Sequence, residues 1–107
     1  MTAEAADLVL RALADPTRRT MLRLVRSQEL AAGQIATHFP ITQQAVSQHL
    51  QVLHRAGLVA ERREGTRRLY TLRPDALGAV RALLDDLWPD ALDRLKRIVE
   101  QDKRSQS

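Results

Sequence analysis

The chain of 107 residues contains no cysteine. Disulfides, thiolate metal sites and cysteine-based catalysis or redox sensing are therefore excluded. The sequence also lacks a run of about 18 apolar residues, and its first 14 residues include Glu4 and Asp7 without a basic start or a cleavage signature. We therefore expect neither a membrane span nor a signal peptide, and by default a cytoplasmic location.

Aromatic residues and glycines are also scarce. Phe39, Tyr70 and Trp88 are the three aromatic residues, too few for the stacking platforms with which proteins bind single-stranded nucleic acid. The four glycines form no Gly-rich phosphate loop, and no cluster of a nucleophile, a base and an orienting acid is recognisable. We therefore predict that the chain is not an enzyme and that it carries no cofactor.

Charge is distributed unevenly along the chain. Residues 42–73 contain six arginines and two glutamates, a net charge of +4, whereas residues 74–102 contain four basic and seven acidic residues, a net charge of −3. A basic segment attracts polyanions. Together with the small number of aromatic residues, this distribution favours double-stranded DNA as the partner.

The composition, 44% hydrophobic and 28% charged, is typical of one folded domain. We place this domain at residues 1–102 and a flexible tail at residues 103–107. Apolar residues at helical spacing predict a first helix that ends at Asp15-Pro16. Asp15 then caps a second helix that has Pro16 at its first position and extends to Ser27.

A helix, a tight turn and a second helix are predicted next. The first of them, at residues 32–38, ends at Phe39-Pro40. The Thr42 hydroxyl is placed to cap a helix over residues 42–56, and Gly57 follows where a left-handed helix terminus is expected. This spacing predicts a helix-turn-helix.

Two short strands follow, at residues 58–63 and 67–72, with a Glu-Gly-Thr turn between them. The expected fold is mainly α with a small β-hairpin, a winged helix-turn-helix of five helices. Its last helix, from Asp75 to about Asp102, would be roughly 40 Å long, longer than such a domain is wide. It therefore needs a further surface to pack on, and Pro89 predicts a kink or a restart within it.

The helix at 42–56 carries a continuous polar stripe. At about 100° per residue, the side chains within about 60° of Gln44 are those of Ser47, Gln48, Gln51 and Arg55, and Gln43 lies at the margin of this stripe. Val46, Leu50 and Leu53 lie on the opposite side. No acidic residue occurs from Thr42 to Ala60, and amides and hydroxyls suit base edges in a major groove. The predicted base contacts are Gln43, Gln44, Ser47, Gln48 and Gln51.

The hairpin and further residues of this helix supply the predicted phosphate contacts. Alone, an arginine-rich hairpin would be read as a solvated edge strand. Beside the polar stripe, phosphate contact becomes the better interpretation. The predicted phosphate contacts are Thr42, His49, Arg55, Arg62, Arg63, Arg67 and Arg68.

Four segments resemble the bacterial ArsR family of winged helix-turn-helix repressors. They are LADPTRR at 13–19, AVSQHLQVL at 45–53, AGLV at 56–59 and REGTRRLYTL at 63–72. The resemblance implies a homodimer that pairs its first and last helices, binds a palindromic operator and often represses its own operon until an effector, unknown here, releases it. The implied dimer interface comprises Leu8, Val9, Leu84, Leu87, Trp88, Leu92 and Leu95.

The resemblance also bears on metal binding. With Trp88 in its last helix, the chain is similar to the SdpR-like branch of the family, which is generally not metal-sensing. Ala31 and Gly33 stand where thiolate sensors of the family have cysteines, and the last helix contains Asp85 and Asp86 but no histidine. We therefore expect no metal site. A metal-responsive repressor of the same family and a winged-helix module that binds another protein remain the alternatives.

Overall fold

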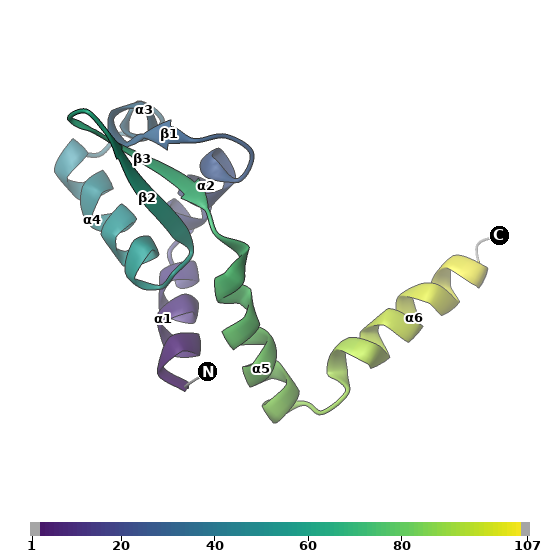
Figure 1. Cartoon of the computed structure of the whole chain (residues 1–107). Coiled ribbons are helices and arrows are strands. Elements are labelled where there is room, and N and C mark those ends of the chain that lie inside the picture. Colours follow the sequence, from purple (N-terminus) through teal and green to yellow (C-terminus); the bar gives the residue numbers. More distant parts are fainter. Residues whose placement is uncertain (1–2, 106–107) are drawn as a thin grey trace.

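The computed structural model describes the backbone of residues 3–105 and the side chains of residues 4–90 and 93–104. Figure 1 shows its elements in chain order. They are α1 (Ala3–Ala14), α2 (Pro16–Val25), β1 (Leu30–Ala31), α3 (Ala32–Ala36), α4 (Gln43–Arg55), β2 (Val59–Glu64), β3 (Arg67–Leu72), the 3₁₀ helix η1 (Pro74–Ala76), α5 (Leu77–Leu87) and α6 (Ala91–Ser105). The mainly helical fold with a small β-hairpin is confirmed.

Capping side chains set where α2 and α4 begin. Asp15 Oδ1 accepts hydrogen bonds from the backbone N–H of Thr17 at 2.7 Å and of Arg18 at 3.2 Å. Thr42 Oγ1 accepts one from the backbone N–H of Ala45 at 3.1 Å. Each bond satisfies a donor that a helix leaves without a partner in its first turn. Both predicted caps are confirmed.

The sheet has three strands where the sequence predicted two. β2 and β3 form the antiparallel hairpin, and β1 pairs with the other edge of β3, so the order is β1-β3-β2. Gly57 (φ 77°), at the end of α4, and Gly65 (φ 63°), at the tip of the hairpin, adopt left-handed conformations that glycine tolerates best. Because β1 contains two residues, it has no alternation by which a strand could be recognised.

The core lies between α1, α2, α4 and the sheet. Met21, Ile35 and Leu50 are fully buried within it. Val9 also belongs to this core, with 1% of its surface exposed. The prediction of Val9 at a dimer interface is therefore wrong, because its side chain is already covered within the protomer.

The last predicted helix is interrupted, as Pro89 indicated. Proline has no backbone N–H and pushes the preceding Trp88 out of the helical region, where φ is −134°. Asp90 then adopts φ 64°, and the chain restarts as α6. The helix extends to Ser105, so the predicted tail is helical over residues 103–105; residues 106–107 lie outside the described part.

α5 packs along α1, whereas α6 extends away from the body of the molecule (Figure 1). The radius of gyration is 17.0 Å, compared with about 13 Å for a compact domain of this length. Among residues 3–105, no helix has the length and apolarity required to cross a membrane.

Candidate nucleic-acid interface

The two faces of α4 differ in burial as the sequence predicted. Val46, Leu50 and Leu53 are 0% exposed and fix the helix to the core. The opposite face is open to solvent except for Ser47, which is half-buried. The exposed polar residues on this face are Gln44, Gln48 and Gln51, and Gln43 is exposed at the first position of the helix, where it lines the same concave surface as Ser47. The structure thus brings together all five residues predicted to contact bases.

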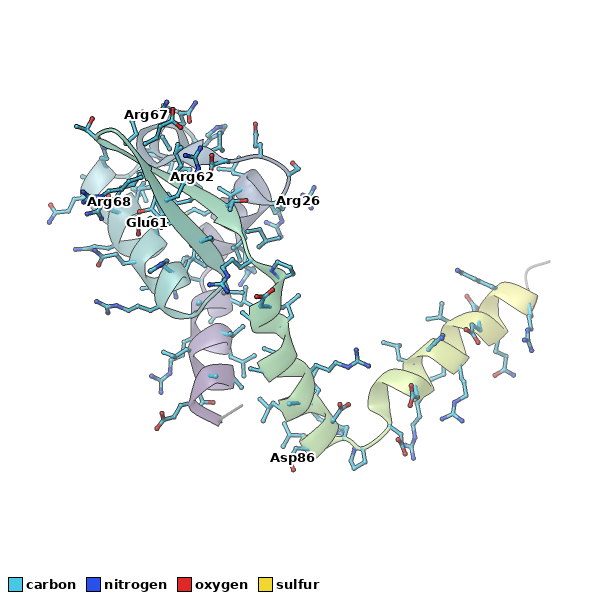
Figure 2. All side chains as sticks on the ribbon, viewed as in Figure 1. Arg26, Glu61, Arg62, Arg67, Arg68 and Asp86 are labelled. Atoms are coloured by element: carbon cyan, nitrogen blue, oxygen red, sulfur yellow. The ribbon has the colours of Figure 1, made fainter. Side chains whose placement is uncertain are left out.

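The hairpin presents its arginines on two opposite faces. The register pairs Arg63 with Arg68 and Glu64 with Arg67. Paired residues share a face and successive residues alternate, so Arg63 and Arg68 lie on one face while Arg62 and Arg67 lie on the other. Figure 2 shows Arg68 toward α4 and Arg67 toward α3. The four arginines predicted as one group are therefore two pairs.

A groove of about 590 Å³ separates the hairpin from α4. Gln43 and Ser47 line it from α4, and Arg67 and Arg68 line it from β3. The α3 segment from Ala32 to Gln34 completes the wall. Amide, hydroxyl and guanidinium groups thus surround one concave surface at the start of α4, and this combination suits a polyanion that displays base edges.

Arg63 and Arg68 share one face of the hairpin, and Arg68 lines the groove. Arg68 Nε lies 3.5 Å from Glu61 Oε1, and 47% of the Arg68 side chain is exposed. Such an exposed pair is weak, so Arg68 can exchange it for a phosphate at little cost. Arg63 is exposed and has no acidic group within 4.0 Å among the described residues.

Arg62 has a different environment. Its Nε and Nη2 donate to the two carboxylate oxygens of Glu29, at 2.8 Å and 2.6 Å, and Nη2 also lies 3.1 Å from Glu64 Oε2. The hydrogen bond from Arg62 holds the pKa of Glu29 below its usual value, and the bond to Glu29 raises the pKa of Arg62. Two carboxylates thus compensate this arginine, which ties β2 to the turn before β1. No local pattern around Glu29 indicates this pairing, because its partner lies 33 residues away.

Arg67 lies on the same face as Arg62. Its Nη2 is 3.4 Å from Gln34 Oε1, and that oxygen also accepts the backbone N–H of Ala31 at 2.9 Å. Arg67 is exposed and retains donors for a further contact. It borders the groove from the α3 side.

The remaining predicted phosphate contacts surround α4. Thr42 and Arg55 are exposed at its two ends. His49 is half-buried, and its Nδ1 lies 3.3 Å from Nη1 of Arg18. Over residues 3–105, no three His, Asp or Glu side chains come together as a potential metal site.

The residues predicted at a dimer interface lie mostly on the surface. Leu8 is 45% exposed, Leu87 56%, Trp88 60% and Leu95 56%. Leu84 on α5 is half-buried, and the side chain of Leu92 lies outside the described part. Two apolar residues of α6 absent from the prediction, Ile98 and Val99, are also exposed.

Comparison with known proteins decides the family. Residues 15–61 match the family described as bacterial regulatory protein, arsR family. The chain is 41% identical over 101 residues to the HTH-type transcriptional regulator Rv2034 of Mycobacterium tuberculosis, covering 94% of each chain. This chain belongs to the ArsR family. An ArsR-family member is a transcriptional regulator and not an enzyme, and both predictions are confirmed.

Further relatives of this ArsR-family chain include one named as a repressor and one named as an activator. The transcriptional repressor SdpR of Bacillus subtilis is 38% identical over 64% of this chain and 77% of its own. The transcriptional activator HlyU of Vibrio cholerae is 35% identical over 80% of each chain. The crystal structure of a possible transcriptional regulator for arsenical resistance is 46% identical, covers 82% of this chain and 92% of its own, and superimposes with a TM-score of 0.66.

Proposed function

We propose that this ArsR-family regulator is a homodimeric repressor that binds a palindromic operator in double-stranded DNA. The observation that carries the proposal is the exposed amide and hydroxyl stripe of α4 beside a groove bordered by arginines. In the major groove, glutamine pairs with adenine through two hydrogen bonds, whereas arginines of the hairpin hold the backbone. The stripe then specifies the sequence and the hairpin positions the protein.

Base contacts are assigned to the polar stripe of α4, and phosphate contacts to the hairpin and to the other polar residues of α4. Gln44, Gln48 and Gln51 project from one face of a helix that three buried residues on its opposite face hold in place, as base recognition requires. We include Arg63, Arg67, Arg68, Arg55, Thr42 and His49 as phosphate contacts. We leave Arg62 out, since two carboxylates already compensate its charge.

Dimerisation is supported by apolar surface that the protomer leaves uncovered. Leu87 and Trp88 at the end of α5 and Leu95, Ile98 and Val99 on α6 are each at least 46% exposed. A second copy of the chain would cover such a surface. Two copies read two half-sites about 34 Å apart, which raises both affinity and specificity.

The proposal is tested by selecting bound sequences from a random duplex library with the purified chain. We expect a palindromic consensus, and Gln48→Ala should lose about tenfold or more of its affinity for the selected duplex. Gln28→Ala, an exposed glutamine in the turn before β1, is the matched control and should bind like the wild type. Selection of no consensus would refute the proposal.

The sign of regulation requires a second measurement. A reporter gene placed behind the selected operator should be less active when the chain is expressed, and the Gln48→Ala variant should restore its activity. Increased reporter activity would make the chain an activator and would overturn the repressor assignment while leaving DNA binding intact.

A further inference from the structure

Arg18, at the start of α2, lies between the end of α1 and the middle of α4. Its Nε donates to the carbonyl oxygen of Ala12 at 2.8 Å, and its Nη2 donates to that of Arg11 at 2.9 Å. Nη1 lies 3.3 Å from His49 Nδ1 and 3.8 Å from Asp15 Oδ2. The side chain is 16% exposed. One guanidinium thus joins three helices.

Part of this arrangement is ordinary helix capping. The last carbonyl groups of a helix have no partner within it, and Arg18 supplies donors to two of them in α1. Arg19 does the same for a third, because its Nη1 donates to the Leu13 carbonyl oxygen at 2.7 Å. The two neighbouring arginines therefore share the capping role, and Arg18 is the one that also contacts α4.

The contact with His49 fixes the imidazole ring. A guanidinium has only donors, so Nδ1 must accept the hydrogen bond and the ring hydrogen of the neutral imidazole must be on Nε2. His49 is next to Gln48 in the stripe and precedes the buried Leu50. A constraint on the His49 ring is therefore a constraint on how α4 is rotated and how far it advances toward DNA.

We propose that Arg18 is a positioning residue that sets the orientation of α4 through His49 and couples it to the end of α1. The inference rests on the proposed function, since it assumes that α4 reads DNA. α1 is also the helix along which α5 packs, and it contacts α4 directly, so a displacement of these two helices reaches α4 through that packing and through the hydrogen bonds of Arg18. Arg18 acts without touching DNA, and its loss lowers discrimination between sequences.

The test compares the affinities of Arg18→Gln, His49→Ala and the double variant for the selected duplex and for a scrambled duplex of equal length. We expect each single variant to reduce the ratio of the two affinities by about tenfold. The affinity ratio of the double variant should be no lower than that of the less selective single variant, because both single substitutions remove the same interaction. Arg19→Gln is the matched control: it removes a capping bond from α1 but should keep the ratio within about twofold.

His49→Asn separates positioning from a direct phosphate contact. Asparagine keeps an acceptor near the position of Nδ1 and leaves every bond from Arg18 to α1 in place, but it removes the Nε2 donor. We expect this variant to retain the affinity ratio while binding both duplexes more weakly. It also keeps the proposal testable if Arg18→Gln does not fold, which urea unfolding would show.

Three results would overturn the inference. They are an equal loss in Arg18→Gln and Arg19→Gln, independent losses that multiply in the double variant, and a His49→Asn variant as unselective as His49→Ala. Gln48→Ala is measured in the same series. If neither Gln48→Ala nor the Arg18 and His49 variants lower the affinity ratio, the role of α4 in reading DNA fails. If Gln48→Ala lowers the ratio and the Arg18 and His49 variants do not, the role of Arg18 fails and DNA reading by α4 stands.

Discussion

The different ion pairing of the hairpin arginines predicts that they contribute unequally to DNA binding. A phosphate contact to duplex DNA adds about −0.9 to the slope of log affinity against log salt concentration. A dimer contains two copies of Arg68, so Arg68→Gln should flatten the slope by about 1.8. Between 50 and 200 mM salt, the variant should then lose about 12-fold less affinity than the wild type.

Arg62→Gln is the matched control, since it removes the same charge from the same hairpin. Arg62 is bonded to Glu29 and Glu64, so we expect its slope to change by less than about 0.5. Fluorescence anisotropy with a labelled operator at five salt concentrations gives both slopes. Equal flattening by the two substitutions would refute the exclusion of Arg62 from the phosphate contacts, and an unchanged slope in Arg68→Gln would refute the phosphate contact of Arg68.

Three further predictions concern stability and assembly. Leu50→Ala should lower the free energy of unfolding by about 2–5 kcal/mol in urea titrations, because Leu50 is 0% exposed, whereas Gln51→Ala on the exposed face should change it little. Ile98→Asp should convert the dimer to a monomer in light scattering, whereas Arg97→Asp, which lies on the other side of α6 from the apolar residues at about 100° per residue, should leave the mass unchanged; a monomeric wild type would contradict this. Burial raises the pKa of Asp15, but its bonds from Arg18 and Thr17 outweigh this and lower the pKa below 3.8. The ionised Asp15 carboxylate therefore stabilises the fold at pH values above 3.8, and this stabilisation is lost as the pH falls through the folded pKa. The difference in unfolding free energy between wild type and Asp15→Asn should be largest near neutral pH and shrink in acid. A difference that grows in acid would refute the direction of the pKa shift.

The elements predicted correctly from the sequence are those with local signals. Asp15 and Thr42 each bond to a backbone N–H within three residues, and Gly57 ends the helix that it follows. The missed features depend on distant partners. Glu29 pairs with Arg62 across 33 residues, and β1 exists as a strand because Leu30 and Ala31 align with Tyr70 and Leu69. Val9 was misassigned because its apolar spacing does not reveal which neighbour covers it.

Arg18 contacts both α1 and α4 and can therefore couple the proposed dimer surface to the proposed DNA-reading surface. The proposed dimer surface lies on α5 and α6, and the proposed reading surface lies on α4, with α1 packed between α5 and the rest of the core. An effector that moves α1 against α4 would therefore break or strain the contact between Arg18 and His49 before it disturbs the fully buried Leu50. Loss of that contact changes affinity for the operator without requiring the dimer to separate. A variant at Arg18 should accordingly remain dimeric in light scattering while its operator affinity falls, and separation of the subunits would show that Arg18 acts through assembly instead.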